Sequence, residues 1–244
     1  MGETKYSAYE LVEGNRVSPV LFSCEHASQE LPPEWTWDVR DRRLVSTHWA
    51  FDLGAAELTR EFADAYNAPA ILARFSRLLV DPNRPIESNT LFRDHAEGEP
   101  VFMNTDVEPG ERSRRLERCY EPYHEAFHRL VGESSAGVLF SVHSFTPVYE
   151  GAMREMEVGV LFDEDEGLAH ELAEVIAGSG FRVALNEPYS GKGGLMYSVQ
   201  RHATAHRRRA VELELRQDLA VQPAIRAKLI QCLLEAKGVF TQTP

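Results

Sequence analysis

Two histidines follow segments that read as buried strands. His26 comes directly after residues 17–24 (VSPVLFSC), and His143 comes directly after residues 137–142 (GVLFSV). Two histidines and one carboxylate are the usual protein ligands of a catalytic zinc ion, which keeps one coordination position open. His26 and His143 are therefore candidate nitrogen ligands of a zinc site.

The carboxylate that completes such a site is left open by spacing alone. Asp52 lies four residues after His48, so the two side chains share a face if this segment is helical. Glu30 follows His26 by four residues, in a segment that reads as a loop. Glu25 adjoins His26 but points to the opposite side if the strand continues. Asp52, His48 and Glu30 all remain candidates for the third ligand.

Three arginines and an asparagine lie within residues 74–84 (RFSRLLVDPNR). Guanidinium groups bind carboxylates through two parallel hydrogen bonds, so Arg77 and Arg84, with Asn83, are candidates for binding an acidic substrate. Structural ion pairs with the many acidic residues of the chain are the alternative interpretation.

Two glutamates alternate with leucines in residues 210–215 (AVELEL), which reads as a strand. Their spacing of two places Glu212 and Glu214 on one face. A glutamate on a buried strand is costly unless it is paired or functional. A general base beside a zinc site explains one of them, and an ion pair with Arg216 or another arginine explains the second.

The elements that must position these residues alternate along the chain, which is typical of an α/β domain. We expect strands at residues 17–24, 70–75, 137–142, 157–162, 181–184 and 210–215, and helices at 42–66, 110–133, 166–177 and 223–237. Residues 76–110 read as a long irregular excursion, and such excursions are usually functional or mobile. No linker-like segment appears, so residues 1–244 are expected to form one domain. The candidate residues follow strands, where open α/β sheets bind ligands.

Composition excludes several classes of function. The chain has 26 Lys and Arg against 38 Asp and Glu, a formal net charge of −12, which disfavours nucleic acids and anionic membranes as partners. Its apolar runs are shorter than the ~20 residues of a membrane-spanning helix, and its first residues lack the pattern of a signal peptide. Cys24, Cys119 and Cys232 are an odd number at wide spacing. They form neither a disulfide framework nor a zinc finger, and a reducing cytoplasm is the expected location.

Taken in order, these motifs resemble those of the N-formylglutamate amidohydrolase family, from about residue 19 to residue 219. The matching stretches are SCEHAS at 23–28, HWAFDLG at 48–54, SRLLVDPNRP at 76–85, SVHSFTP at 141–147, NEPYSG at 186–191 and ELELRQDL at 212–219. The family is similar to the zinc carboxypeptidases and aspartoacylases. The resemblance implies a three-layer α/β/α sandwich with a mixed, mostly parallel, zinc-carboxypeptidase-like sheet. It also implies one Zn²⁺ ion and hydrolysis of an N-formyl or N-acyl amino acid.

The resemblance also implies a metal-ligand set. His26 and His143 match the zinc histidines, and Asp52 is our choice for the third ligand. The His-x-x-Glu pattern of carboxypeptidases is not kept, because Gln29 stands three residues after His26. His48 and Glu30 therefore remain alternatives.

Roles in catalysis and substrate binding carry over in the same way. Glu214 precedes Leu-Arg as the catalytic glutamate of the carboxypeptidases does, so we prefer it to Glu212 as the base. Arg77 resembles the arginine that polarises the scissile carbonyl. The pair Asn83-Arg84 resembles the one that grips a substrate carboxylate, and Tyr189 is expected to line the substrate side.

Two other interpretations keep the metal but change the function. An aspartoacylase-like or carboxypeptidase-like hydrolase would use the same site on another small substrate. A non-catalytic metal-binding domain would belong to a different class. Glu214 and Arg77 argue against the latter, because a structural zinc ion usually has four protein ligands and needs neither a base nor an arginine. The sequence leaves the oligomeric state open.

Overall fold

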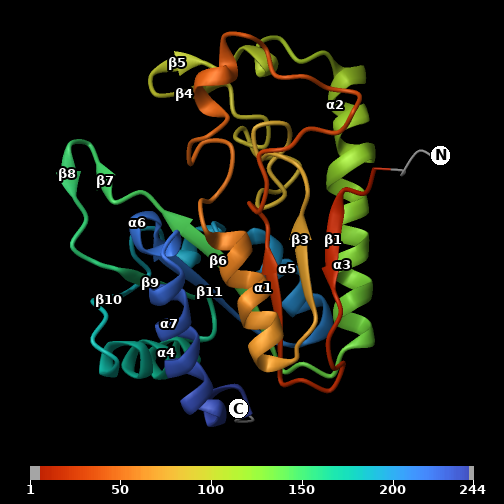
Figure 1. The fold of residues 1–244 in the computed structure, drawn as a ribbon. Coiled ribbons are helices and arrows are strands. Elements are labelled where there is room, and N and C mark those ends of the chain that lie inside the picture. Colours follow the sequence, from red (N-terminus) through yellow and green to blue (C-terminus); the bar gives the residue numbers. More distant parts are fainter. Residues whose placement is uncertain (1–5, 242–244) are drawn as a thin grey trace.

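A seven-stranded sheet forms the centre of the computed structural model, which describes residues 6–241 (Figure 1). The strand order is β1-β3-β2-β6-β11-β9-β10. The strands are β1 (Tyr9–Val12), β2 (Val20–Cys24), β3 (Ala70–Ala73), β6 (Val138–Phe145), β9 (Val158–Leu161), β10 (Val183–Leu185) and β11 (Arg209–Arg216). The β1–β3 and β11–β9 pairs are antiparallel and the other four are parallel. The predicted mixed, mostly parallel sheet is confirmed.

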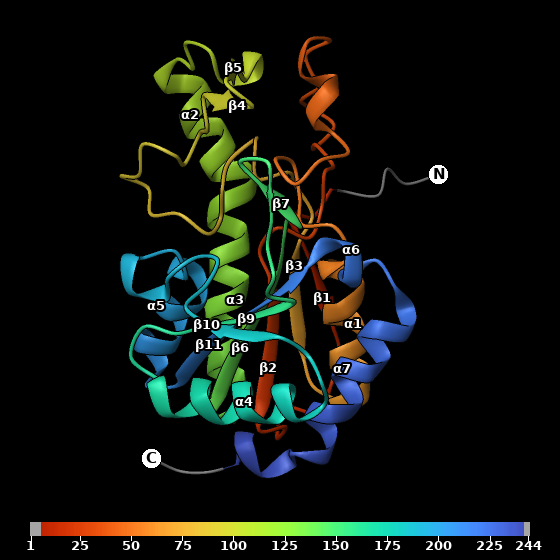
Figure 2. The same cartoon turned by 90° about the vertical axis from the view of Figure 1, so that its left-hand side faces the viewer.

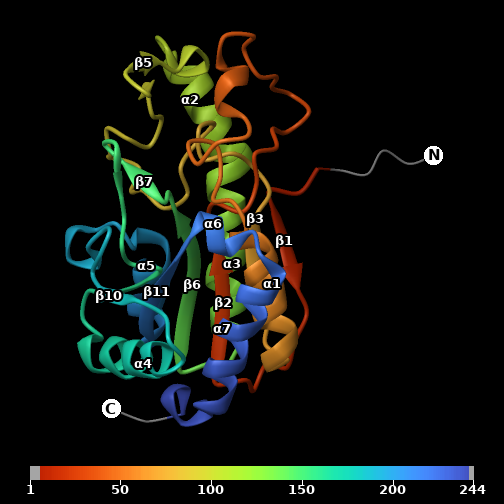
Figure 3. The ribbon, with the colours of Figure 1, turned by 60° about the vertical axis from the view of Figure 1, so that its left-hand side comes forward.

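Helices cover both faces of this sheet, as Figures 2 and 3 show. One face carries α1 (Ala55–Tyr66), α4 (Glu166–Gly178) and α7 (Pro223–Glu235), and the other carries α3 (Glu121–Glu133) and α5 (Tyr197–His206). Two short helices accompany them, α2 (Pro109–Arg115) and α6 (Gln217–Ala220). A single π-helical turn, Leu116–Tyr120, joins α2 to α3. The predicted three-layer α/β/α sandwich is therefore confirmed.

The two faces of the sheet are built by alternating side chains. On β2, Val20 and Phe22 pack beneath α1, whereas Leu21 between them packs beneath α3. Phe22 stacks on Phe62 of α1 with ring centroids 5.3 Å apart. Each fully buried side chain of this size contributes roughly 1.5–3 kcal/mol of transfer free energy. The buried side chains on the two faces hold the strands in register and so fix where each strand ends.

Long connections gather beyond the carboxyl ends of the parallel strands (Figure 1). Residues 76–108 are irregular but ordered by buried polar contacts, and they include the hairpin β4 (His95–Ala96) and β5 (Glu99–Pro100). The Asp41 carboxylate accepts hydrogen bonds from the backbone N–H groups of Phe102 (2.9 Å) and Met103 (2.7 Å). A second hairpin, β7 (Val148–Tyr149) and β8 (Ala152–Met153), follows β6. These connections form the walls above the sheet.

The predicted helix over residues 42–66 begins only at Ala55, so its first half was predicted wrongly. Local side-chain bonds replace helical ones, because the Thr47 hydroxyl donates to the Leu44 carbonyl at 2.7 Å and accepts from the Trp49 N–H at 3.3 Å. Gly54 then has a φ of 79°, which a helix interior does not allow.

Several short elements of the fold were absent from the sequence-based prediction. The edge strand β1, the helix α5 and the small hairpins were not predicted, whereas the other predicted elements appear with boundaries shifted by a few residues. Cys24, Cys119 and Cys232 are free and buried, in agreement with the sequence. No helix within residues 6–241 is both long enough and apolar enough to cross a membrane.

Candidate metal centre and active site

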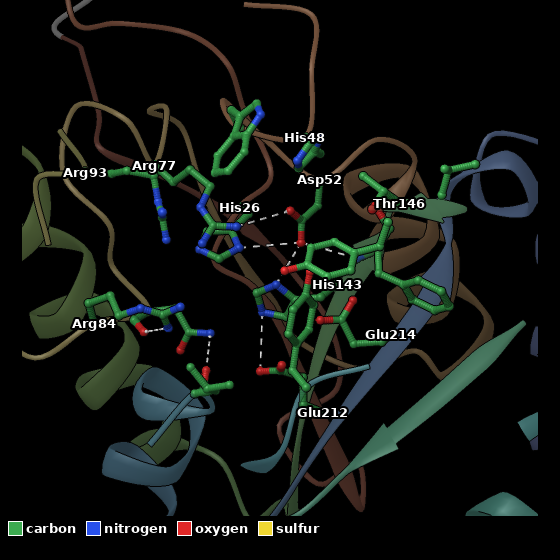
Figure 4. Close-up of a pocket in the computed structure, with 18 of the residues that line it drawn as sticks. His26, His48, Asp52, Arg77, Arg84, Arg93, His143, Thr146, Glu212 and Glu214 are labelled. Carbon is green, nitrogen blue, oxygen red and sulfur yellow. Dashed lines mark hydrogen bonds and ion pairs between the residues drawn. The ribbon is translucent and has the colours of Figure 1, made fainter. Parts of the chain in front are cut away.

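Three buried side chains converge near the carboxyl ends of β2 and β6: His26 follows β2, His143 lies on β6, and Asp52 lies in the segment before α1 (Figure 4). Nδ1 of His143 lies 2.9 Å from Oδ2 of Asp52, and Nδ1 of His26 lies 3.5 Å from the same oxygen. The ligand atoms of the three residues all lie within 4.8 Å of one another. Ligands at about 2.0–2.2 Å from one tetrahedral ion are about 3.3 Å apart, so the spacing suits zinc.

The second ring nitrogen of each histidine is held by a different carboxylate. Nε2 of His26 lies 2.8 Å from Oδ1 of Asp81, and Nε2 of His143 lies 3.1 Å from Oε2 of Glu25. Outer carboxylates of this kind fix the tautomer and orientation of metal-binding histidines. Both Nδ1 atoms therefore face Asp52.

Backbone contacts place Asp52 against the two strands. Its N–H donates to the His26 carbonyl at 2.9 Å, and its Oδ2 accepts from the Ser144 N–H at 3.2 Å. Gly54 makes the left-handed turn that leads into α1, and a Cβ there would collide with the backbone of Ala220. The irregular segment, rather than a helix face, thus carries the carboxylate into the centre.

The electrostatics of the triad favour a positive charge at its centre. Burial alone would raise the pKa of Asp52, but the charges of His26 and His143 outweigh burial and lower it. Burial would lower the pKa of His143, yet the carboxylates of Glu212, Asp52 and Glu25 raise it well above its ordinary value. Nδ1 of His26 is buried without a hydrogen-bond partner. A divalent cation would supply the positive charge that the carboxylates favour and a partner for Nδ1 of His26. These residues therefore fit a zinc ion.

The two alternative ligands lie outside this group. His48 lines the same cavity, where its ring lies tilted against Trp49 with ring centroids 4.7 Å apart, and burial lowers its pKa. The Glu30 side chain is exposed. Within residues 6–241, the metal-ligand group contains Asp52 and neither of these two residues.

Arg77 contacts Asp81, which holds a metal-ligand histidine, and lies near Asp52, a proposed ligand itself. Its Nη2 donates to Oδ2 of Asp81 at 2.9 Å, and its Nη1 lies 3.7 Å from Oδ1 of Asp52. Burial would lower the pKa of Arg77, but these two carboxylates raise it. The guanidinium therefore stays charged at the edge of the cavity.

Glu212 and Glu214 project from β11 toward His143. Oε2 of Glu212 lies 3.5 Å from Nε2 of His143, which is the ring nitrogen that faces away from Asp52. Oε2 of Glu214 is buried without a hydrogen-bond partner, and so is Oε2 of Glu212. Burial raises the pKa of Glu214 well above its ordinary value, with Asp52 adding to the effect and His143 opposing it. Arg216 pairs with Asp218 instead of with either glutamate.

Asn83 is occupied by the backbone of another segment. Its Nδ2 donates to the Leu195 carbonyl and its Oδ1 accepts from the Ser198 N–H, both at 2.9 Å. Direct binding of substrate by Asn83 stays a prediction, and these contacts favour a positioning role. Nη1 of the neighbouring Arg84 donates to the Asn83 carbonyl at 2.8 Å, and the side chain lines the cavity.

The centre opens into a cavity of about 390 Å³. Arg77, Arg84 and Arg93 approach it from one side, and Glu212 and Glu214 from the other (Figure 4). The remaining wall includes Tyr189 and Tyr149 of the β7–β8 hairpin. Gly159 of β9 makes room for the loop that carries Tyr189, because a Cβ there would collide with the carbonyl of Glu187.

Three residues of this site, Asp81, Glu25 and Arg93, have no role predicted from the sequence. Asp81 contacts His26 and Glu25 contacts His143, and each contact joins segments that are far apart in the sequence. Arg93 was not singled out, although it lines the cavity 5.3 Å from the ring centre of Trp49. No described carboxylate pairs with Arg93, and burial together with Arg77 lowers its pKa. A charged residue within the irregular excursion was the only available signal.

Comparisons with known proteins agree with the geometry. A family model described as N-formylglutamate amidohydrolase matches residues 18–221. The N-formylglutamate deformylase of Pseudomonas putida is 29% identical over 228 residues, covering 82% of this chain and 80% of that protein. The corresponding Pseudomonas aeruginosa protein is 26% identical over 222 residues, with the same coverage of 82% and 80%.

Two crystal structures share the fold over nearly their whole length. The Agrobacterium tumefaciens gene product Atu2144 has a TM-score of 0.88 and 30% identity, covering 98% of this chain and 97% of that one. N-formylglutamate amidohydrolase from Ralstonia eutropha JMP134 has a TM-score of 0.72 and 19% identity, covering 96% and 98%. With a family model matched over most of its length and the predicted motifs gathered at one centre, this chain belongs to the N-formylglutamate amidohydrolase family.

Proposed function

We propose that the chain forms one catalytic domain that uses Zn²⁺ to hydrolyse an N-formyl amino acid to formate and the free amino acid. The observation that carries this proposal is the buried His26–Asp52–His143 group beside the unpartnered carboxyl of Glu214. Both relatives from Pseudomonas are named N-formylglutamate deformylases. We place the reaction in the cytoplasm, because three free cysteines suit a reducing compartment.

The proposed ligands are His26, Asp52 and His143. When bound, zinc lowers the pKa of water toward about 7 and polarises a carbonyl oxygen. Glu214 is proposed to accept the proton of the attacking water as a new C–O bond forms at the formyl carbon. It then returns this proton to the amino-acid nitrogen as the C–N bond breaks. Glu212 lies 3.5 Å from Nε2 of His143, the ring nitrogen that faces away from Asp52, and this contact supports Glu214 over Glu212 for the role.

Arg77 is proposed to stabilise the negative charge that develops on the carbonyl oxygen. Its contacts with Asp81 and Asp52 hold the guanidinium in place before substrate arrives. A preorganised donor of this kind is worth roughly 3–4 kcal/mol in the transition state. The fixed orientation of the Arg77 guanidinium supports this role, because the side chain need not move during the reaction.

Substrate recognition is proposed to depend on the other arginines. No carboxylate within residues 6–241 forms an ion pair with Arg84 or Arg93, although both line the cavity. Cations that face a cavity without a protein partner suit an anionic ligand. Arg84 is proposed to bind the amino-acid carboxylate, with Asn83 positioning the adjoining segment and Tyr189 lining the substrate side.

The experiment is a formate-release assay on N-formyl-L-glutamate, N-formyl-L-aspartate and N-formyl-L-leucine, with N-acetyl-L-glutamate assayed for acetate. The proposal expects formate release that chelator abolishes and added Zn²⁺ restores. Preferential acetate release would favour an aspartoacylase-like specificity. Zinc binding without hydrolysis of any member of the panel would favour a non-catalytic metal-binding domain.

A further inference from the structure

Four histidines face one another across two packed helices on the α3 side of the sheet. α3 carries His124 and His128, and α5 carries His202 and His206. Each pair has a spacing of four residues, so each places its two rings on one helix face. The two helices pack together, and their histidines meet in two successive layers.

The two layers repeat the same geometry. Nδ1 of His124 lies 3.0 Å from Nε2 of His202, and Nδ1 of His128 lies 3.1 Å from Nε2 of His206. The first pair, which we call the inner pair, is buried, with His124 4% exposed and His202 2% exposed. The second, which we call the outer pair, lies at the surface.

The spacing of the outer pair suits chelation of a metal ion. Two imidazole nitrogens at about 2.0–2.1 Å from one ion are roughly 2.9–3.4 Å apart for bond angles between 90° and 109°. The observed 3.1 Å falls within this range. A surface position leaves the remaining coordination positions of the ion open to water.

The surroundings hold the ring of His206 in place. Gly132 of α3 lies beneath it, and a Cβ at that position would be 3.2 Å from Cε1 of His206. Partial burial lowers the pKa of His206, and His128 lowers it further. The ring is therefore neutral near pH 7 and able to offer a lone pair.

We propose that His128 and His206 form a second metal site for a divalent transition-metal ion of the zinc, nickel or copper class. Imidazole nitrogen favours these ions over magnesium and calcium. A cavity of about 550 Å³ adjoins His128, and its lining includes Glu121, Glu125 and Arg201.

Such an ion links His128, in the second half of α3, to His206, the last residue of α5. α5 begins at Tyr197, and the Ser198 N–H at its first turn is held by Asn83. Crosslinking the two helices therefore stabilises α5, whose opposite end is hydrogen-bonded to Asn83. The site is a stabilising one, separate from the His26–Asp52–His143 group.

The test is a titration of the zinc-loaded protein with further Zn²⁺, followed by calorimetry and by the melting temperature. We expect one additional equivalent to bind and the melting temperature to rise, because ligands that bind only the folded state stabilise it. His206→Gln and His128→Gln should each weaken this binding at least tenfold. Gly132→Ala should weaken it too, because it displaces the ring of His206. His170→Gln, an exposed histidine on α4, is the matched control and should bind as the wild type does.

Two outcomes would overturn the proposal. One is the absence of any further equivalent at millimolar Zn²⁺. The other is unchanged binding in the His128→Gln/His206→Gln double variant, which would leave the outer pair as a hydrogen bond between two rings. His26→Ala separates this proposal from the proposed function, because it should remove the first ion and keep the second.

Discussion

The carboxylate of Asp81 joins a proposed metal ligand to a proposed catalytic arginine. Its Oδ1 lies 2.8 Å from Nε2 of His26, and its Oδ2 accepts a hydrogen bond from Nη2 of Arg77 at 2.9 Å. Its pKa is held well below the ordinary value by Arg77 and His26, although burial opposes this shift. One ionised side chain therefore orients both the proposed metal ligand and the proposed catalytic arginine.

Asp81→Asn should weaken zinc binding by about 10–100-fold, which is the usual effect of losing an outer carboxylate. The amide keeps the shape but lacks the charge that orients His26. Zinc affinity measured by competition with a chelator gives the readout. Asp218→Asn, which removes a carboxylate paired with Arg216 outside the cavity, is the matched control. Equal affinities in Asp81→Asn and the wild type would contradict the assigned role.

Glu214→Gln should retain zinc and fold but lose on the order of 10²–10⁴ in kcat, the usual contribution of a general base. Steady-state formate release measures the loss, and metal analysis verifies the site. Glu212→Gln is the matched control, because Glu212 lies two residues away on the same strand face. If the loss appears in Glu212→Gln while Glu214→Gln stays active, the base has been assigned to the wrong residue.

The site residues that the sequence predicted lie on or next to strands with a clear apolar pattern. His26 was found because it follows a strand with a recognisable apolar run, His143 because it lies near the end of such a strand, and Glu214 because alternation fixes its face. Asp52 required the family resemblance, since residues 45–54 form no regular element. Asp81 and Glu25 act through contacts between distant segments, which no local spacing reports.

The missed elements have a similar explanation. α5 buries Ser198 and His202 beside Val199 and Ala203, so its core face is partly polar and its helical period is masked. β1 is a short edge strand whose residues are only partly buried. Neither presents the apolar pattern by which a helix or strand is recognised.

Arg84→Lys should raise KM more than it lowers kcat. Lysine keeps the positive charge but lacks the planar fork that binds a carboxylate through two hydrogen bonds. A contact shared by the ground and transition states changes KM alone. Kinetics on N-formyl-L-glutamate and on its α-carboxamide provide the test. Equal rates on both substrates in the wild type would rule out a carboxylate clamp.

Arg77→Lys should show the opposite pattern, with a larger fall in kcat than rise in KM. The charge that Arg77 is proposed to stabilise develops only in the transition state. The same assay separates the two arginines. Equal changes in both kinetic constants, together with a lower melting temperature, would indicate that Arg77 is structural.

His202→Gln should make stability less dependent on pH in mildly acidic solution. Burial lowers the pKa of His202 to about 2, with His124 adding to the shift, and burial lowers the pKa of His124 to about 3. Both groups have a pKa of about 6.5 in the unfolded chain. Below this value the unfolded chain binds more protons than the folded one, so stability is complete above about pH 6.5 and falls as pH decreases.

Each such histidine contributes a slope of about 1.4 kcal/mol per pH unit well below pH 6.5. Urea unfolding of His202→Gln at pH 7.0, 5.5 and 4.5 should therefore show a slope smaller by about that amount. His170→Gln, exposed on α4, should keep the wild-type slope. Parallel curves for His202→Gln and the wild type would show that His202 titrates normally.

The central claim is that His26, Asp52 and His143 hold the zinc ion on which hydrolysis depends. The most direct measurement is zinc content and formate release in the purified wild type and in Asp52→Ala and His143→Ala, with His170→Gln as the control. The account predicts about one tightly held zinc per chain in the wild type and the control. It predicts loss of both zinc and activity in the two triad variants. Full zinc content and undiminished activity in either triad variant would contradict it.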